Sequence, residues 1–314
     1  MNHIGRIIKK YRIMRKMSQK ALAKNICTEK YVYLIEKGER TPSAEMIGLF
    51  GDRLEVDLFD YYQFMDCADP VAVSEILKKF QIYQSATDFE SMPEIVREAE
   101  KLPDLKKKPW IYELEANRFG CMVFKDNQYA EAIKGMTRIL ANIDAKHKES
   151  IYVANLHMLL STCYQITGDL EHAKESTQAA YEIIRPKFRI EKYRHAVITV
   201  RLNFMTLYYL LGEFSRAVEE AEELIAYQKR YNAWSRIHFT YAFLAFSYYE
   251  AGQLEEAFAN FEHMIQMSLF NDQHTDIFFI SLQPSFAKMA ADERADRIMM
   301  KKFWEKYGET LGKK

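Results

Sequence analysis

The sequence predicts an all-α protein in which a five-helix N-terminal domain is followed by a solenoid of helical repeats. Three observations support this fold class. Apolar residues recur at helical spacing along the chain, and no stretch alternates as a half-buried strand would. Residues 18–42 carry the caps of two short, closely spaced helices. From about residue 110, one spacing of aromatic, glycine and alanine residues recurs.

Five short helices are predicted over about residues 1–65. Apolar residues at helical spacing in 4–14, 46–50 and 54–59 give the first, fourth and fifth helices, the last ending near Tyr62.

The second and third helices are delimited by their caps. Ser18 can cap a helix over 19–24 whose Ala21 and Leu22 face inward, and Thr28 can cap a helix that runs to Lys37. Val32 and Ile35 share one face of the latter, and Gly38 follows where a helix end needs a positive φ. Two helices at this separation predict a helix-turn-helix, whose second helix enters the DNA major groove.

These residues resemble the Cro/repressor type of helix-turn-helix. The matching positions are Ser18, Gln19, Leu22, Ala23, Thr28, Val32, Ile35, Glu36, Gly38, Arg40, Pro42 and Ser43. The turn, Asn25-Ile26-Cys27, is one residue shorter than the common version and lacks its glycine.

Charge is distributed unevenly along the chain. The whole sequence has 44 Lys and Arg against 44 Asp and Glu, but residues 1–40 hold 11 basic and 3 acidic residues, a net of +8. The remainder therefore carries −8. A basic N-terminal domain on an acidic body is typical of a nucleic-acid-binding domain joined to a part that does not bind nucleic acid.

Several function classes lack support in the sequence. The four cysteines (Cys27, Cys67, Cys121 and Cys163) form no C-x-x-C pair, so neither a disulfide framework nor a zinc site is expected. No histidine spacing, phosphate loop or nucleophile motif predicts catalysis, a metal or a cofactor. No apolar run approaches the roughly 18 residues of a membrane span. We expect a cytoplasmic protein that is not an enzyme.

The chain is predicted to divide into three parts. Residues 1–66 form the helix-turn-helix domain, 67–108 a linker and first helical hairpin, and 109–314 the repeats with a C-terminal capping helix. Pro70 can start the hairpin, whose helices are expected over about 71–84 and 92–101.

Three copies of one spacing define the repeats. Each has Tyr, then Gly four residues later, then Ala five residues after the Gly, and a degenerate copy around Asn127 and Ala132 precedes them. The copies are Tyr164/Gly168/Ala173, Tyr208/Gly212/Ala217 and Tyr248/Gly252/Ala257. These are tetratricopeptide signatures, which imply a right-handed α-solenoid. The glycines are 44 and 40 residues apart, against ~34 for the common repeat, so longer helices are expected.

The C-terminal segment is predicted to add a further first helix of a repeat, over 277–289, and a last helix over about 292–308. The charged residues of the last helix suit a helix that caps the solenoid and exposes one face to solvent. This region could equally hold a dimer contact.

A Cro-type domain followed by long tetratricopeptide repeats resembles the PlcR/NprR group of peptide-sensing quorum regulators of Gram-positive bacteria, the RRNPP type. The short Asn25-Ile26-Cys27 turn and the Val200-Arg201-Leu202-Asn203 run are similar to that group. The resemblance implies a homodimeric transcription regulator whose domains bind a roughly palindromic double-stranded operator. It also implies that a short signalling peptide lies in the concave groove of the repeats.

The candidate DNA-binding residues lie in or beside the second and third helices. Gln19 would donate to a phosphate, with Tyr31, Lys37 and Arg40 near the backbone, whereas Thr28, Glu29, Lys30 and Tyr33 would face base edges.

Three positions of the third helix have more than one interpretation. Glu29 could accept from cytosine or only support the helix N-terminus, and Leu34 could touch a thymine methyl or pack. Glu36 is interpreted as an internal support.

The candidate peptide-binding residues lie on the first helix of each repeat, away from the Leu/Tyr packing face. They are Asn117, Asn155, Met158, Thr162, Gln165, Arg201, Asn203, Thr206, Tyr209, Phe239, Phe246, Tyr249 and Phe279, with Cys121, Phe124, Thr199 and Ala242 as further groove positions. Asn203 could pair with a peptide backbone or join two helices. For the aromatic residues, the alternative is packing in the core. For Arg201, the alternative is pairing with neighbouring glutamates.

A second class of function remains open. The repeats could bind a protein partner, such as a response regulator or a phage antagonist, with the N-terminal domain as a repressor head.

Overall fold

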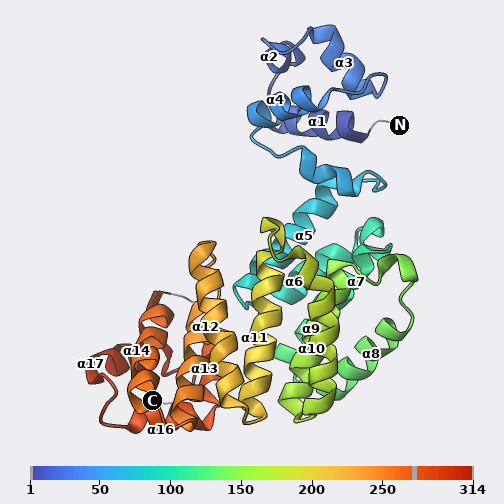
Figure 1. Ribbon diagram of the computed structural model, residues 1–314. Coiled ribbons are helices and arrows are strands. Elements are labelled where there is room, and N and C mark those ends of the chain that lie inside the picture. Colours follow the sequence, from blue (N-terminus) through green and yellow to red (C-terminus); the bar gives the residue numbers. More distant parts are fainter. Residues whose placement is uncertain (1–2, 271–273, 313–314) are drawn as a thin grey trace. The chain divides into compact units, whose positions relative to one another are not determined.

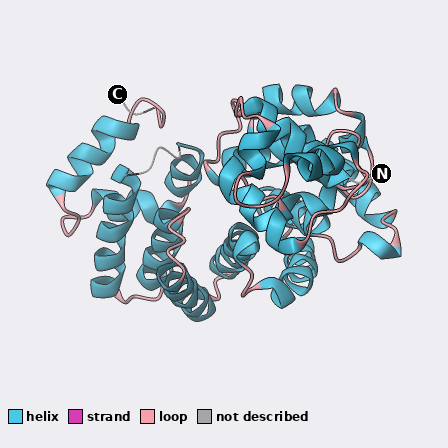
Figure 2. Ribbon diagram, turned by 90° about the horizontal axis from the view of Figure 1, so that it is seen from above, coloured by secondary structure: helices cyan, strands magenta, loops and turns pink. Residues whose placement is uncertain are grey.

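The computed structural model describes residues 3–270 and 274–312. Every regular element in these residues is a helix and none is a strand, which confirms the all-α fold class (Figure 2). The chain divides into two compact units, residues 1–79 with 101–105, and residues 80–100 with 106–314. The predicted boundary at residue 66 lies inside the first unit, and the three-part division stays a prediction.

The first unit contains the expected succession of short helices (Figure 1). They are α1 (His3–Met14), α2 (Gln19–Ala23), α3 (Glu29–Lys37), α4 (Ala44–Leu54) and the 3₁₀ helix η1 (Phe59–Phe64). The fifth helix is thus a 3₁₀ helix rather than an α-helix. Its separation from α4 follows from Glu55, which ends α4 at a left-handed φ of 55°.

The core of this unit is formed by apolar residues of α1 to α4. It includes Ile4, Ile8, Leu22, Val32, Ile35 and Phe50, each at most 1% exposed. The expected inward position of Ala21 is wrong, since Ala21 is exposed and Ala23 is buried instead. One turn of helix cannot bury three consecutive positions, and the phase of α2 places 22 and 23 on its inner side.

Two further helices follow the N-terminal domain along the chain. The two helices expected there are present as α5 (Pro70–Ser85) and α6 (Met92–Glu100), followed by the 3₁₀ helix η2 (Pro103–Lys106). The boundary between the two units falls within α5, so the C-terminal part of this helix belongs to the second unit.

The second unit is a series of helical hairpins (Figure 1). Its helices are α7 (Trp110–Phe124), α8 (Tyr129–Ala141), α9 (Ile151–Thr167), α10 (Leu170–Ile184), α11 (Arg194–Leu210), α12 (Phe214–Arg230), α13 (Ile237–Glu250) and α14 (Leu254–Phe270). Helices α9, α11, α12 and α14 have 17 residues each, so the long repeat spacing does lengthen the helices.

The repeat signature serves the turn and the close packing within each hairpin. Gly168, Gly212 and Gly252 have φ values of 82°, 74° and 78°, a region that side chains with a Cβ rarely adopt. Asn127 takes the same role in the degenerate copy, with φ of 55°. The alanines that follow are fully buried, which lets the paired helices approach closely.

The C-terminal end differs from the expectation. The helix expected over 277–289 is two helices, α15 (His274–Ser281) and α16 (Pro284–Ala291), because Pro284 has no N–H to continue the first and instead starts the second. The last helix, α17 (Arg297–Tyr307), begins later than expected, where Asp296 caps it by accepting from the Ile298 and Met299 N–H groups.

Two glycines within helices of the first unit provide a matched pair for testing its packing. A Cβ built on Gly5 of α1 would lie 1.9 Å from the Ile35 carbonyl oxygen, whereas one on Gly48 of α4 would meet nothing within 4 Å. We expect Gly5→Ala to lower the free energy of unfolding by about 2 to 3 kcal/mol, because α1 and α3 must move apart. Gly48→Ala should raise it by about 0.5 to 1 kcal/mol. Urea unfolding measures both, and a Gly5→Ala protein as stable as the parent would contradict the close contact.

Candidate functional site

The two helices of the helix-turn-helix are fixed by local caps. Ser18 Oγ accepts from the Ala21 N–H at 3.0 Å, and Thr28 Oγ1 accepts from the Tyr31 N–H at 3.2 Å. Gly38 closes α3 at φ 78°, as expected. Asn25 has φ of 59°, so an asparagine takes the left-handed position in the turn that lacks a glycine.

A residue that the sequence analysis missed holds the end of α2. The Arg53 guanidinium of α4 donates to the carbonyl oxygens of Leu22 and Lys24, which the short helix leaves without partners. No local pattern predicts this contact, because about 30 residues separate the partners along the chain.

Glu36 is the internal support of the helix-turn-helix. It is 8% exposed, and Arg12 donates to both of its oxygens, at 2.6 and 3.0 Å. Gln19 Nε2 donates to the same carboxylate at 2.7 Å. Helices α1, α2 and α3 are thereby joined through one buried charge that has a cationic partner.

The candidate DNA-binding residues fall into two groups. Thr28, Glu29, Lys30, Tyr33, Lys37 and Arg40 are exposed, whereas Gln19 and Tyr31 are half-buried. Since one hydrogen of the Gln19 amide is committed to Glu36, only the second could reach a phosphate. The Lys37 ammonium lies 5.3 Å from the centre of the Tyr33 ring, and hydrogen bonding to Tyr33 raises the pKa of Lys37.

The second unit contains a cavity of about 260 Å³. Its lining comes from the α5–α6 segment, from the first helices of successive hairpins (α7, α9, α11 and α13), and from α15. A cavity that takes side chains from four consecutive repeats has the extended form that suits a chain-like ligand.

The middle of the cavity is lined by amide and hydroxyl groups that also join α9 to α11. Asn203 Nδ2 donates to the Met158 carbonyl at 2.9 Å. Gln165 Nε2 donates to the Asn203 carbonyl at 3.3 Å, and Thr206 Oγ1 donates to Gln165 Oε1 at 2.6 Å. The interpretation of Asn203 as a residue that joins two helices is thus confirmed. Its pairing with a peptide stays a prediction for a residue that lines the cavity.

A buried carboxylate lies behind one end of the cavity. Glu113 of α7 is 5% exposed and accepts from Asn155 at 2.6 Å, from Gln84 at 2.9 Å and from Asn117 at 3.3 Å. Burial raises the pKa of Glu113, because the three amide donors lower it by less. All three donors line the cavity.

A buried ion pair lies elsewhere in the cavity wall. Arg236 donates to both oxygens of Asp276, at 2.9 and 2.8 Å, and His238 Nε2 lies 3.5 Å from the same carboxylate. Burial alone would raise the pKa of Asp276, but Arg236 and His238 outweigh it and lower the pKa to about 2. Burial and the Arg236 charge lower the pKa of His195 to about 4, so this ring is neutral at pH 7.

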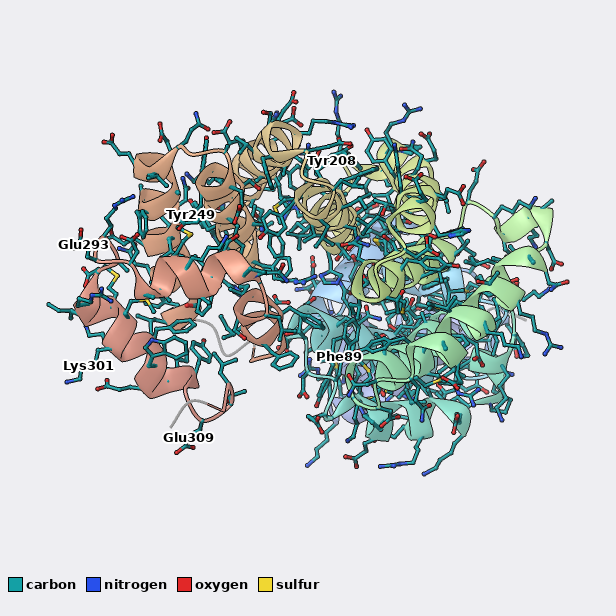
Figure 3. All side chains as sticks on the ribbon, turned by 90° about the horizontal axis from the view of Figure 1, so that it is seen from below. Phe89, Tyr208, Tyr249, Glu293, Lys301 and Glu309 are labelled. Atoms are coloured by element: carbon teal, nitrogen blue, oxygen red, sulfur yellow. The ribbon has the colours of Figure 1, made fainter. Side chains whose placement is uncertain are left out.

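Aromatic rings from three separate segments line another part of the cavity. Phe89, labelled in Figure 3, lies in the α5–α6 connection. Its ring centre lies 4.1 Å from that of Phe124, and the Phe124 ring centre lies 5.9 Å from that of Phe279 on α15. These rings give an apolar surface for ligand side chains next to the polar groups of α9 and α11.

Nine of the thirteen candidate peptide-binding residues line the cavity. They are Asn117, Asn155, Met158, Thr162, Gln165, Asn203, Thr206, Phe239 and Phe279. Of the further groove positions, Phe124 and Thr199 line it, whereas Cys121 and Ala242 do not.

The structure places the other four candidates outside the lining. Arg201 of α11 donates to Glu220 and Glu223 of α12. These two carboxylates pair with its charge on the side of α11 that does not line the cavity. Phe246 is fully buried in the core, and the Tyr209 ring packs on it while its hydroxyl pairs with Ser285. Tyr249 packs on Phe258 of α14 and lies away from Phe89 in Figure 3.

Other lining residues were missed. They include Gln84, Thr87, Phe89, His195, Arg236, Asp276 and Gln283. Most lie in connections or at helix starts, outside the repeat signature. One of the missed residues has an unusual backbone conformation. Arg236 has a left-handed φ of 57°, which is costly for an arginine.

Two features are absent from the described residues. None of the helices combines the length and the apolarity needed to span a bilayer. In residues 3–270 and 274–312, no three His, Cys, Asp or Glu side chains are grouped as a metal site would need.

Comparisons with known proteins agree with this architecture. Residues 8–60 match the helix-turn-helix family and form a DNA-binding domain of that class. A search of curated protein sequences finds no match to the chain.

Solved structures match nearly the whole chain. PlcR from Bacillus thuringiensis, in complex with the peptide PapR7 and DNA, is 16% identical with a TM-score of 0.65, covering 90% of this chain and 100% of PlcR. Apo PlcR is 15% identical with a TM-score of 0.52 and the same coverage. ComR from S. thermophilus, in complex with DNA and its signalling peptide ComS, is 14% identical with a TM-score of 0.51, covering 88% of this chain and 97% of ComR. The chain shares their fold.

Removal of the Glu36 carboxylate tests the support of the helix-turn-helix. We expect Glu36→Ala to lower the free energy of unfolding of the N-terminal domain by about 3 kcal/mol, because Arg12 and Gln19 lose their shared partner inside the protein. Glu39→Ala, one residue past Gly38 and exposed, is the control and should change stability by less than about 0.5 kcal/mol. Equal stability of the two variants in urea unfolding would show that Glu36 does not hold the helices together.

Proposed function

We propose that this chain is a sequence-specific DNA-binding transcription regulator whose activity is controlled by a short peptide bound in the cavity of the repeats. The observation that carries this proposal is the coexistence in one chain of a helix-turn-helix domain and a cavity lined by side-chain amides. The fold shared with PlcR and ComR, both solved with DNA and a signalling peptide, supports it.

The N-terminal domain would dock with the start of α3 in the major groove. Thr28, Glu29, Lys30 and Tyr33 are exposed on or just before the first turns of this helix, which is where such domains contact base edges. Lys37 and Arg40 follow at its end, where a phosphate backbone passes. Gln19 of α2 and Tyr31 of α3 complete the proposed interface.

The cavity would hold the peptide through its main chain. Amide and hydroxyl side chains supply hydrogen bonds that do not depend on peptide sequence, and the Phe89, Phe124 and Phe279 rings supply an apolar surface for its side chains. A cavity of about 260 Å³ lined by the first helices of the hairpins favours a peptide over the folded protein partner, the alternative that the sequence left open.

The regulator would act in the cytoplasm as a homodimer on a roughly palindromic operator, because two identical domains recognise two-fold related half-sites. If the peptide changes affinity for DNA, DNA must change affinity for the peptide by the same factor.

Lys30 tests the proposed docking. We expect Lys30→Ala to weaken binding to a duplex that the full chain selects from a random pool, by about 1 to 3 kcal/mol if the ammonium contacts a guanine. If Lys30 contacts a phosphate instead, the substitution would weaken binding to all DNA sequences alike. It would also reduce the slope of log affinity against log salt concentration by about 1. Lys174→Ala, exposed on α10, is the control. Unchanged affinity and slope in gel shifts would rule out contact between Lys30 and DNA and so contradict docking through the start of α3.

Asn203 tests the proposed cavity site. We expect Asn203→Ala to abolish retention of peptides that the full chain selects from a random pool, while DNA binding without peptide stays intact. Stability should fall by only about 1 kcal/mol for the lost hydrogen bond to Met158. Asn260→Ala is the control, since that amide also donates to a backbone carbonyl but lies outside the cavity. Normal peptide affinity of Asn203→Ala in calorimetry would place the peptide elsewhere.

A further inference from the structure

The end of the cavity next to Glu113 has an unusual electrostatic composition. Glu113 is almost fully buried, and all of its hydrogen bonds come from the neutral amides of Gln84, Asn117 and Asn155. No Lys, Arg or His in the described parts of the chain forms an ion pair with it. This differs from Glu36, whose buried charge is matched by Arg12.

The same hydrogen bonds fix which way the three amides point. A carboxylate only accepts, so each amide must turn its NH₂ group toward Glu113. The Asn117 oxygen then accepts from Gln84 at 2.9 Å. Gln84 Oε1 and Asn155 Oδ1 accept no hydrogen bond from the described residues, although both side chains line the cavity. This end of the cavity therefore offers acceptors to a ligand.

The remaining charges of the cavity wall do not compensate Glu113. Arg236 and Asp276 neutralise one another through two hydrogen bonds, so neither is available as a counter-ion without breaking that pair. His195 is neutral at pH 7. The cavity and its immediate support thus carry a net charge of about −1 when Glu113 is ionised.

One end of the cavity is formed by Gln84, Asn117 and Asn155, with Glu113 behind it. We propose that this end holds a positively charged group of the peptide, an inference that rests on the proposed function. That group is either its α-ammonium or a lysine or arginine side chain. An ammonium has only donors and would satisfy Gln84 Oε1 and Asn155 Oδ1. Its charge would also offset that of Glu113 in a medium of low polarity, where charge pairing is strong. A ligand carboxylate at this end would meet acceptors and a like charge.

The test compares pools of random heptapeptides made from uncharged residues, all with amidated C-termini. One pool has a free N-terminus, one is N-acetylated, one is N-acetylated with a single lysine, and one is N-acetylated with a single glutamate. Each is mixed with the full chain, and the peptides that stay bound through gel filtration are quantified by mass spectrometry.

We expect the parent protein to retain a cationic pool about tenfold more than the acetylated uncharged pool, and the glutamate pool least. Preference for the free N-terminus or for lysine identifies the source of the charge. Glu113→Gln should abolish the preference, whereas Glu131→Gln, exposed on α8, should keep it. Gln84→Met removes one acceptor while leaving Glu113 two donors, and should reduce the preference severalfold even if Glu113→Gln does not fold.

Equal retention of the charged and uncharged pools by the parent protein would overturn this inference and leave the proposed function standing. A cationic preference that persists in folded Glu113→Gln would also overturn it. Retention of no pool at all would contradict the proposed function as well.

Discussion

The repeats depend on hydrogen bonds that side-chain amides facing the cavity make to neighbouring helices. Asn203 donates to a carbonyl of α9, and Gln165 donates back to a carbonyl of α11, so the two hairpins are joined through the polar wall of the cavity. A buried amide without partners would be costly. The NH₂ groups are satisfied inside the protein, and the oxygens of Gln165 and Asn117 accept from Thr206 and Gln84. The oxygens of Gln84, Asn155 and Asn203 are what remain for a ligand. The need to satisfy buried donors thus decides the chemistry that the cavity presents.

Two buried glutamates show how this constraint works in the two units. Glu36 has Arg12 as a counter-ion and a donated hydrogen bond from Gln19, so its charge is matched and its role is to join helices. The Glu113 carboxylate accepts hydrogen bonds from three amides, at 2.6, 2.9 and 3.3 Å, but has no counter-ion in the described part of the chain. The first arrangement is complete within the protein. The second has no counter-ion in the described part of the chain, which is why we associate it with a cationic ligand.

Local patterns in the sequence predicted most of the fold. Ser18 and Thr28 cap their helices as expected, and the glycines of the repeats occur at left-handed turns. These features depend on neighbours within a few residues. The helix expected over 277–289 was wrong because apolar spacing was given more weight than Pro284, which breaks the segment in two. The inward position predicted for Ala21 was wrong because α2 has only five residues, too few for the sequence pattern to fix which of them face inward.

The cavity was predictable only where a repeat helix supplies it. Side chains on α9 and α11, such as Thr162 and Asn203, follow from helix phase. Tyr209 and Phe246 lie on similar helices, yet they pack into the core, because large apolar rings gain more from burial against neighbouring helices. Gln84 lies in the last turn of α5, whereas Arg236 and Asp276 lie at helix starts, and their contacts join residues 29 to 40 positions apart. No spacing in one sequence reveals such contacts.

The proposed regulation depends most on whether the peptide binds in the cavity of the second unit. A crystal structure of the full chain with a peptide that it retains tests this directly. The account predicts electron density for the peptide along α7, α9 and α11, with its main-chain N–H groups facing the oxygens of Asn155 and Asn203. Density on the outer helices α8, α10 and α12, with the cavity empty, would contradict it.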